Sequence, residues 1–299
     1  MSKPVVLVTG ANGFTGKHLV PTLQGRGYAV VGVGNGVSAA DRDVACDLTD
    51  AAQVRSAVQE VRPTHVVHLA ALSFVGHGDA RAFYDVNLFG TLNLLQALAG
   101  LPTVPEKVLV ASSANVYGTP GIEVIDEAVC PAPVNHYACS KLAMEHMVRT
   151  WFERLPIVMT RPFNYTGVGQ NEQFLIPKIV NHFKQRADGI ELGNLDVSRD
   201  FSDVRDVVNA YAALLASEVN AEVFNVCSGR AVALRSVLDM ATRMTGHAPQ
   251  VVVNPAFVRA NEIPVLRGAN DKLASAIGFA PRYALEDTLQ WMLQKAEPA

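Results

Sequence analysis

The sequence is short of charged residues, of cysteines and of long apolar runs. Charged residues make up 18% of its 299 positions, below the roughly one quarter that is usual, and the net charge is −3. A general nucleic-acid binder would carry a clear basic excess, so that class of protein is disfavoured. No apolar run approaches the roughly 20 residues of a membrane-spanning helix, and the amino terminus lacks a signal-peptide pattern. We therefore expect a soluble, cytoplasmic protein with neither a membrane nor a nucleic-acid partner.

The cysteines and histidines show none of the spacings that hold disulfides or metals. The four cysteines, Cys46, Cys130, Cys139 and Cys227, include no Cys-x-x-Cys pair, and no two histidines form a His-x-x-x-His motif. This pattern fits a reducing compartment and predicts no metal site. His136 could contact a substrate, although a solvated histidine at a helix start is the simpler interpretation.

Strand-like and helix-like segments alternate in the first half of the sequence. Apolar runs predict strands at 5–8, 28–33, 65–69, 107–111 and 157–160, and helical spacing predicts helices at 14–24, 51–61, 80–99 and 137–154. Strands that alternate with such helices predict a doubly wound α/β fold around a parallel sheet. After residue 162 the alternation breaks, with turn-rich segments at 190–201 and 255–268. Helices are still expected at 204–217 and 235–245, with a strand at 223–226 between them.

A glycine-rich turn follows the first predicted strand. Glycines at such a turn let the backbone approach a pyrophosphate, which would rest on the free N–H groups of the next helix. An incidental turn is the alternative, but the position inside a strand–helix–strand unit favours dinucleotide binding. We expect cofactor contacts from Gly10, Asn12, Gly13, Phe14, Thr15 and Gly16.

The glycine turn and the break after residue 162 predict two domains. The first is a dinucleotide-binding Rossmann domain over residues 1–162, to which residues 202–228 return. The second is a smaller, mixed α/β domain formed by residues 163–201 and 229–299, which would supply the substrate contacts.

The end of the second predicted strand lacks the acid with which NAD-dependent enzymes hold the ribose 2′-hydroxyl. That position is Gly34, followed by Asn35, for which we expect a cofactor contact. Asp41 and Asp43 lie several residues later, and a solvated loop is their simpler interpretation. No acid would repel a 2′-phosphate at Gly34, so NADP(H) should be accepted, alone or alongside NAD(H).

Three further residues suggest acid–base chemistry. Tyr137 and Lys141 lie four residues apart, which is one helical turn on the same face. The lysine charge would lower the pKa of Tyr137 from about 10 toward neutrality, where the phenol can exchange a proton with a carbonyl or alcohol. A surface pair is the alternative. Ser113, at the carboxyl end of a predicted parallel strand, favours an oxidoreductase-type site because ligands bind at that edge.

These motifs resemble those of the extended short-chain dehydrogenase/reductase family. The glycine turn has the family's Gly-x-x-Gly-x-x-Gly spacing, and Asn87 is followed by the expected Gly90-Thr91. The resemblance implies that Ser113 polarises the reacting carbonyl while Tyr137 and Lys141 contact both cofactor and substrate. It also implies cofactor contacts from Asp47 beside the adenine and from Leu48, Leu69, Ala70, Ala71 and Asn87.

The residues after Ser113 separate this sequence from the dehydratases of the same family. Sugar-nucleotide dehydratases carry Asp-Glu or Ser-Glu there, whereas this sequence has Ala114 and Asn115. Neither side chain can act as a base at neutral pH, so dehydration is disfavoured.

In the second half, the family's positions for binding a nucleotide-diphosphate sugar are occupied by Asn164, Arg199, Arg259 and Glu262. Arginine suits a diphosphate because its planar fork donates two parallel hydrogen bonds. The alternatives are a strand-end turn residue for Asn164 and a salt-bridge partner for Glu262. Ser73, a further expected substrate contact, stands where many relatives have a basic residue.

Three stretches, at 161–170, 193–206 and 224–229, are similar to the GDP-4-keto-6-deoxy-D-mannose reductases. This similarity implies NAD(P)H-dependent reduction of the C4 ketone of a nucleotide-linked 4-keto-6-deoxyhexose. A GDP-linked sugar is favoured, with GDP-D-rhamnose or its C4 epimer as product. A nucleotide-sugar 4-epimerase with tightly bound NAD is the alternative. A non-catalytic cofactor sensor is disfavoured because Ser113, Tyr137 and Lys141 are all present.

The segment 92–99 is apolar nearly all round, which predicts burial on more than one side. In the family, this helix and the helix that carries Tyr137 pair with a second subunit as a four-helix bundle. A homodimer is therefore expected, consistent with the low charge, and a core within one chain is the alternative.

Overall fold

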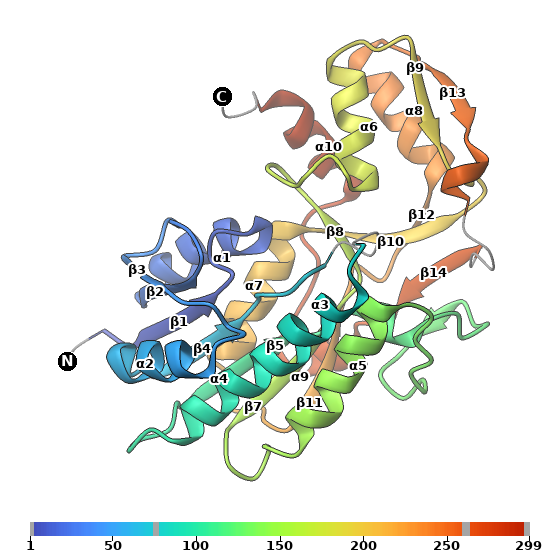
Figure 1. Cartoon of the computed structure of the whole chain (residues 1–299). Coiled ribbons are helices and arrows are strands. Elements are labelled where there is room, and N and C mark those ends of the chain that lie inside the picture. Colours follow the sequence, from blue (N-terminus) through green and yellow to red (C-terminus); the bar gives the residue numbers. More distant parts are fainter. Residues whose placement is uncertain (1–2, 74–77, 259–263, 296–299) are drawn as a thin grey trace.

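The structure is a computed structural model, and it describes residues 3–73, 78–258 and 264–295 (Figure 1). Its larger lobe is built on a seven-stranded, wholly parallel sheet with the order β11-β7-β5-β4-β1-β2-β3. The strands are β1 (Val5–Thr9), β2 (Ala29–Gly34), β3 (Arg42–Ala45), β4 (His65–His68), β5 (Lys107–Ala111), β7 (Ile157–Pro162) and β11 (Glu222–Val226). The predicted doubly wound parallel sheet is confirmed.

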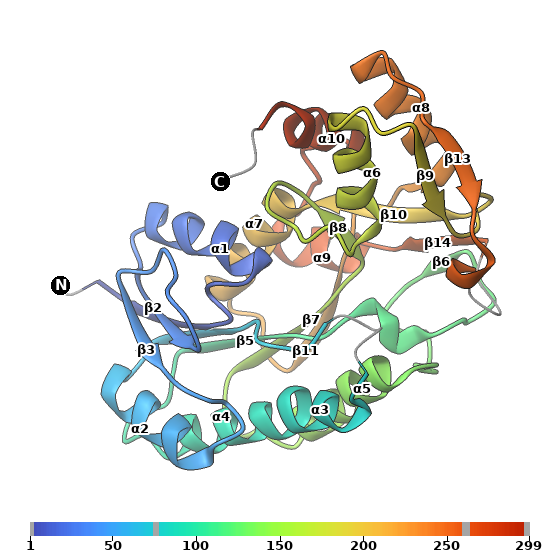
Figure 2. The same cartoon turned by 45° about the horizontal axis from the view of Figure 1, so that its top comes forward.

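Helices cover both faces of this sheet (Figure 2). They are α1 (Phe14–Gly25), α2 (Ala51–Val61), α3 (Ala80–Tyr84), α4 (Gly90–Ala99), α5 (His136–Arg149), α7 (Val204–Leu215) and α9 (Asp271–Ile277). One apolar core joins the sheet to α2, α4 and α5, and a second joins it to α1, α7 and α9. Residues of β1 alternate between the two cores, which is why the strand is apolar at nearly every position.

Two predicted helices differ most from their expected bounds. The segment 80–99 is helical, but a π-helical turn at Asp85–Phe89 separates α3 from α4. The helix expected over 137–154 ends at Arg149, and the residues after it form turns in which the N–H of Trp151 bonds to the carbonyl of Val148. A short 3₁₀ turn, Ala114–Tyr117, follows β5.

The smaller lobe contains a five-stranded mixed sheet and a two-stranded parallel pair, packed against three helices. The strands are β6 (Val124–Ile125), β8 (Asn164–Thr166), β9 (Gly189–Leu192), β10 (Ser198–Asp203), β12 (Ala231–Ala233), β13 (Gln250–Val253) and β14 (Val265–Gly268). The helices are α6 (Leu175–Lys184), α8 (Leu234–Thr245) and α10 (Leu285–Gln294), and a 3₁₀ turn spans Pro255–Phe257. None of the described helices is long and apolar enough to cross a membrane.

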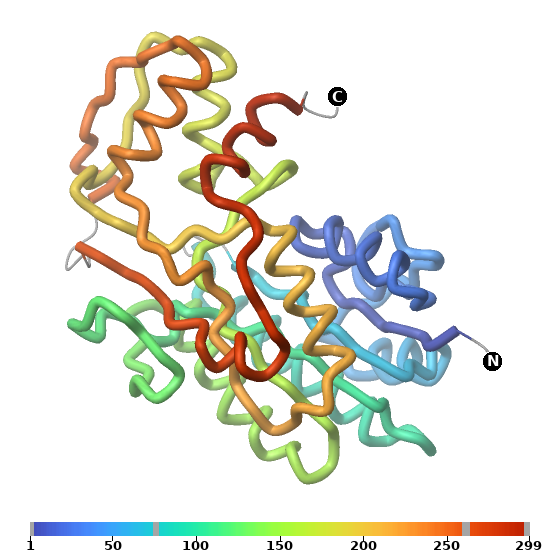
Figure 3. Tube along the Cα trace, turned by 180° about the vertical axis from the view of Figure 1, so that it is seen from behind, coloured from blue at the N-terminus to red at the C-terminus, as the bar shows by residue number. Residues whose placement is uncertain are grey.

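The division of the chain into two domains remains a prediction, and two segments lie across its expected boundary. The helix α9 packs against β11 and α7 of the larger lobe, although it belongs to the segment 229–299. Conversely, β6 pairs with β14 of the smaller lobe. From behind, the chain can be followed from α9 back up to α10 in the smaller lobe (Figure 3).

Candidate active site

The predicted site residues gather at the carboxyl edge of the larger sheet. Gly10 directly follows β1, Leu69 follows β4, Ser113 lies two residues beyond β5, and Asn164 lies two residues beyond β7. These four strands are neighbours in the sheet. The chain reverses its winding between β1 and β4, and ligands of open α/β sheets bind at such a switch point.

The glycine loop leaves no room for side chains where a pyrophosphate would approach. Gly10 has a φ of +71°, and a Cβ there would lie 2.9 Å from the backbone nitrogen of Ala70. A Cβ on Gly16 would lie 2.3 Å from the carbonyl oxygen of Gly10. Gly13 precedes α1 without a side-chain cap, and the first turn of that helix has no acid. The loop therefore fits the pyrophosphate of a dinucleotide.

Beside the glycine loop, Asn12 donates from Nδ2 to the carbonyl of Asn35 at 3.0 Å. The solvated-loop interpretation is wrong for Asp43, which is half-buried on β3, whereas Asp41 is exposed in a bend before that strand. Asp41 accepts the N–H of Val30, and Asp43 accepts both the N–H and the hydroxyl of Ser38.

Asp43 lies on β3 opposite Gly32 of β2 and lines a small hollow together with Asn12 and Gly34. An acid thus reaches this hollow from the neighbouring strand. This acid could not be predicted from the sequence, because the pairing of β2 with β3 depends on the fold.

A chain of buried hydrogen bonds runs beneath the site from β1 to the helix segment that follows β4. Thr9 Oγ1 lies 2.7 Å from His68 Nδ1, and His68 Nε2 lies 2.8 Å from Thr91 Oγ1. Thr91 donates to the carbonyl of Asn87, and Thr9 accepts the N–H of Ala70. Burial lowers the pKa of His68 to about 3, with Lys141 as a smaller cause. The neutral ring therefore accepts at Nδ1 and donates at Nε2, which satisfies every member of the chain.

Asn87 connects this chain to the helix that carries Tyr137. Its Oδ1 accepts the N–H of Leu72, and its Nδ2 donates to the carbonyl of Leu72 and to Ser140 Oγ at 3.0 Å. Asn87 lies in the π-helical turn, and such turns inside α-helices often occur at functional sites. The predicted residues Leu69, Ala70 and Ala71 lead from β4 to Leu72 at this same edge, and all three are half-buried.

Tyr137 and Lys141 both lie on α5 and are buried. The expectation that Lys141 brings the pKa of Tyr137 toward neutrality is wrong. Burial raises the pKa of Tyr137 to about 12, and a hydrogen bond with Ser113 offsets this only in part. Lys141 instead donates from Nζ to the carbonyl of Ala111 at 2.8 Å, and burial lowers its pKa to about 8. At neutral pH the site therefore holds a protonated phenol and a charged ammonium one helical turn apart.

Ser113 is positioned as the first residue of a capped turn. Its Oγ accepts the N–H of Asn115 at 3.2 Å, so its one hydroxyl proton remains available to a neighbour. Ala114 and Asn115 follow in the 3₁₀ turn, and Asn115 is exposed. The helix α5 is also tied to β7 by a buried ion pair, in which Arg161 Nη2 lies 2.6 Å from Glu145 Oε2.

The two residues expected near the adenine differ in their surroundings. Asp47 is exposed, and one of its carboxylate oxygens accepts the N–H and the hydroxyl of Thr49. Leu48 is buried, and its carbonyl accepts a hydrogen bond from Asn93. A Cβ on Gly90 would lie 3.3 Å from that of Leu48, which explains a glycine at this position of the helix.

The structure brings together two of the predicted substrate residues. In the pairing of β8 with β10, Asn164 lies opposite Phe201, and Arg199 lies two residues before Phe201 on the same face of the strand. Asn164 is exposed and Arg199 half-buried, and Nη1 of Arg199 donates to the carbonyl of Ser198. Ser73 is exposed near the same edge of the larger sheet. The remaining two, Arg259 and Glu262, lie outside the described residues.

Tyr165 is a half-buried tyrosine near the site that was not predicted from the sequence. Its hydroxyl lies 2.7 Å from Thr15 Oγ1, and its ring stacks on Phe14. In the sequence, only its position directly after Asn164, a predicted substrate residue, pointed to a place near the site.

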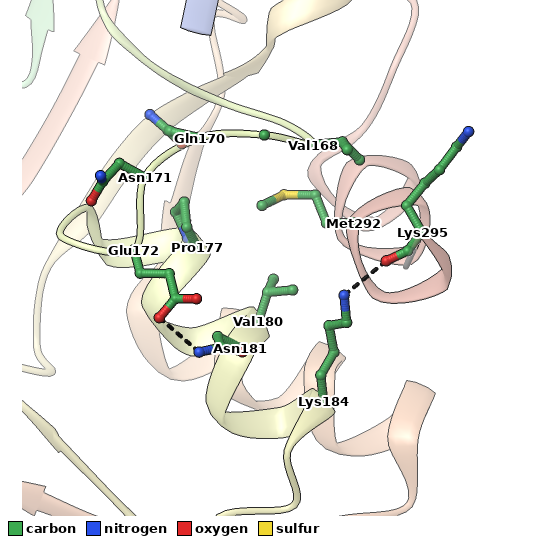
Figure 4. A pocket seen from close by; sticks show the side chains of 11 residues that line it. Val168, Gln170, Asn171, Glu172, Pro177, Val180, Asn181, Lys184, Met292 and Lys295 are labelled. Atoms are coloured by element: carbon green, nitrogen blue, oxygen red, sulfur yellow. Dashed lines mark hydrogen bonds between the residues drawn. The ribbon is translucent and has the colours of Figure 1, made fainter. Parts of the chain in front are cut away.

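A separate hollow lies between α6 and α10, beneath the loop that follows β8 (Figure 4). Val180 and Met292 contribute apolar surface, Glu172 bonds to Asn181, and Lys184 bonds to the carbonyl of Lys295. None of the predicted site residues that the structure describes lines this hollow. Within the described part of the chain, no group of three or more His, Cys, Asp or Glu side chains could hold a metal ion.

The fold, the glycine loop and the arrangement of Ser113, Tyr137 and Lys141 define an NAD(P)-dependent oxidoreductase of the extended short-chain dehydrogenase/reductase type. The sequence model of one family, described as GDP-mannose 4,6 dehydratase, matches residues 7–292. Because the match covers nearly the whole chain, the protein belongs to this family. The resemblance inferred from the motifs is thereby confirmed.

Two curated relatives act on GDP-linked 6-deoxysugars, according to their names. GDP-6-deoxy-D-talose 4-dehydrogenase of Aggregatibacter actinomycetemcomitans is 36% identical over 279 residues, which cover 93% of this chain and 92% of that protein. GDP-6-deoxy-D-mannose reductase of Pseudomonas aeruginosa is 32% identical over 305 residues, which cover 98% of this chain and 97% of that protein.

Two solved structures have the same fold over nearly their whole length. A crystal structure from Burkholderia cenocepacia J2315, described as a candidate epimerase, has a TM-score of 0.92 at 48% identity and covers 98% of this chain and 97% of its own. RMD from Pseudomonas aeruginosa, complexed with NADPH, has a TM-score of 0.86 at 32% identity and covers 97% of this chain and 96% of its own.

Proposed function

We propose that this protein uses NADPH or NADH to reduce the C4 ketone of a nucleotide-linked 4-keto-6-deoxyhexose. The favoured substrate is GDP-4-dehydro-6-deoxy-D-mannose, and the product is GDP-D-rhamnose or its C4 epimer. The observation that carries the proposal is a buried phenol, Tyr137, one helical turn from Lys141, with Ser113 beside them at the carboxyl edge of the sheet. A ketone reduction needs a proton donor at that place.

The residues of the chain account for the proton and the charge. When bound, the nicotinamide cofactor supplies the hydride. Ser113 would donate a hydrogen bond to the ketone oxygen, and Tyr137 would deliver the proton to that oxygen as it becomes an alkoxide. The transfer is favourable because a sugar alkoxide is a stronger base than a phenolate. Lys141, one helical turn away and charged below a pKa of about 8, would stabilise the phenolate that remains.

The substrate class rests on the second lobe and on the relatives. Arg199 and Asn164 share one face of the β8–β10 pair, where a guanidinium and an amide can bind a diphosphate. Both curated relatives are named for GDP-linked 6-deoxysugars, one as a 4-dehydrogenase and the other as a reductase. We propose that Ser73, Arg259 and Glu262 also contact the nucleotide sugar, because of their positions in the sequence.

We do not propose dehydration, although the matching family is described as GDP-mannose 4,6 dehydratase. A 4,6-dehydratase must remove a proton from C5 and expel the C6 hydroxyl. The residues that follow Ser113 are Ala114 and Asn115, and neither has a group that can take up a proton at neutral pH.

A nucleotide-sugar 4-epimerase is the second candidate, favoured by the description of the Burkholderia cenocepacia structure. An epimerase removes a hydride from C4 and returns it to the other face of the same sugar, so it works best when its cofactor never leaves. The purified protein distinguishes the two functions. A reductase is expected to be largely free of cofactor and to oxidise one NADPH or NADH for each ketosugar. Stoichiometric bound NAD⁺, with interconversion of hexose nucleotides in the absence of added cofactor, would establish the epimerase instead.

We also propose a homodimer that forms through α4 and α5. Within one chain, the core already buries Leu94, Leu95 and Leu98 of α4, so these residues need no partner. Phe89, in the turn before α4, is 51% exposed, and a dimer through α4 and α5 would cover it. Light scattering should give twice the mass of the chain, and Phe89→Lys should shift the protein toward a monomer.

A further inference from the structure

A hydrogen bond joins the start of the cofactor helix to the strand that carries Asn164. Thr15 Oγ1 and the hydroxyl of Tyr165 are 2.7 Å apart, and the rings of Phe14 and Tyr165 stack with centroids 5.9 Å apart. Phe14 and Thr15 are the first two residues of α1, directly after the glycine loop. Tyr165 is the residue directly after Asn164 in β8. The contact thus spans the larger and the smaller lobe.

A second contact lies one turn further along α1. His18 Nε2 is 2.9 Å from the carbonyl of Val168, and burial lowers the pKa of His18, so the neutral ring donates from Nε2. Both contact residues lie within the segment 165–170, which is closed by a hydrogen bond from Gln170 Nε2 to the carbonyl of Tyr165 at 3.2 Å. The start of α1 is therefore held at two points, at Tyr165 of β8 and at Val168 in the loop that follows this strand.

Tyr165 also belongs to the side of the site where the reaction is proposed. Tyr165 is half-buried, and it lies close enough to Tyr137 to be one cause of the raised pKa of that residue. The pairing of Tyr165 with Ser202 keeps Asn164 opposite Phe201, on the face shared with Arg199. A small shift of Tyr165 would move Asn164 with it.

We propose that Tyr165 is a positioning residue that couples binding at the glycine loop to the placement of Asn164. The inference rests on the proposed function, since Asn164 is a proposed contact of the nucleotide sugar. A dinucleotide that fixes the start of α1 fixes Thr15, and Thr15 holds Tyr165 and the strand β8. By linkage, a ligand at Asn164 must strengthen dinucleotide binding by the same factor.

Amide hydrogen exchange tests the first half of this coupling without any substrate. Saturating NADPH should slow exchange of the amides in residues 164–168 of the wild-type protein. Tyr165→Phe keeps the stacked ring and removes the hydroxyl, while Thr15→Val keeps the branched shape, and in both variants the NADPH-dependent protection should disappear. The control is Thr22→Val, which removes a hydroxyl that bonds only within α1, to the carbonyl of His18, and should keep the protection.

Two results of the exchange experiment would overturn the proposal. One is protection by NADPH that persists in Tyr165→Phe and Thr15→Val, or that is absent from the wild-type protein. The other is faster exchange in the variants by the same factor with and without NADPH, which would show only a structural role for the hydroxyls.

A binding cycle tests the second half. GDP affinity measured by calorimetry should rise about twofold to tenfold when NADPH is present, which is the scale of one hydrogen bond. Each single variant should bring this factor close to one, and the double variant should lower it no further, because both hydroxyls act through one contact. Equal coupling in the wild-type and variant proteins would contradict the proposal. A wild-type protein that binds no GDP would overturn the proposed substrate class, and the exchange experiment with NADPH alone would still decide the role of Tyr165.

Discussion

The cofactor side and the substrate side of the site are built from different kinds of groups. On the cofactor side, glycines give the backbone its close approach, and the buried polar groups from Thr9 to Asn87 satisfy one another through neutral His68. On the substrate side, Asn164 is exposed and Arg199 half-buried, on two short paired strands. The first side is fixed in shape before a ligand arrives, whereas the second would present charge to the proposed nucleotide sugar. Substitutions on the two sides should therefore impair ligand binding in different ways.

Tyr137 lies between the two sides, and its loss should have the largest effect. Tyr137→Phe removes the proton donor while keeping the buried ring, so turnover should fall by at least about 100-fold, the scale of general acid catalysis. Binding of NADPH and GDP, measured by calorimetry, should stay close to the wild-type values. Near-normal turnover in this variant would remove Tyr137 from its proposed role.

A change of shape should disable the cofactor side. In Gly16→Ala the new Cβ would lie 2.3 Å from the carbonyl oxygen of Gly10, so the free energy of unfolding should fall by about 2–3 kcal/mol and NADPH should bind more weakly. Gly25→Ala is the matched control in the same helix, since a Cβ there meets nothing within 4 Å. It should leave NADPH binding unchanged and raise stability by up to about 1 kcal/mol. Equal effects of the two substitutions, measured by urea unfolding, would contradict the close fit of the loop.

A change of charge should disable the substrate side. Arg199→Ala should weaken GDP binding by about 1.5–3 kcal/mol, the scale of a charge-assisted hydrogen bond, with little change in NADPH affinity. The control is Arg42→Ala on β3, which breaks an exposed ion pair with Glu60 of α2. It should leave GDP binding unchanged. Unchanged GDP affinity in Arg199→Ala would show that the diphosphate binds elsewhere.

The neutral chain on the cofactor side should also appear in the pH dependence of stability. The pKa of His68 is about 3 in the folded protein and about 6.5 in the unfolded chain. Below pH 6.5 the unfolded chain therefore binds a proton at this residue that the folded protein does not bind. Stability should therefore fall as the pH falls, and the slope from this residue alone should approach about 1.4 kcal/mol per unit well below pH 6.5. In urea unfolding, the wild-type protein should lose about 2 kcal/mol more stability between pH 7 and 5 than His68→Gln, because the other histidines titrate in both proteins. Parallel slopes would mean that His68 is not held neutral.

The same contrast explains which parts of the structure the sequence could predict. Strands such as β1 are buried on both faces, so they appear in the sequence as unbroken apolar runs. The motifs follow the carboxyl ends of these strands, and a parallel sheet brings those ends to one edge. The smaller lobe has strands of two to six residues with polar positions, which carry little periodicity. The helix α6 did carry a signal that was overlooked, since Ile176, Ile179 and Phe183 recur at helical spacing.

Other features depend on contacts between distant parts of the chain. The π-helical turn at Asn87 is set by bonds to Leu72 and Ser140, and the hydrogen bond of Tyr165 joins it to a residue 150 positions away. The pKa of Tyr137 was mispredicted for a related reason. The spacing of Tyr137 and Lys141 showed the charge nearby, but it could not show that the phenol is buried.

The most direct test of the central claim is to follow the hydride. NADPH labelled with deuterium at the reacting C4 position, mixed with the purified protein and GDP-4-dehydro-6-deoxy-D-mannose, should give a product with one deuterium at the sugar C4 for each NADPH oxidised. The same mixture with Tyr137→Phe should transfer almost none in the same time. A product without deuterium, formed at an unchanged rate when NADPH is left out, would contradict the account.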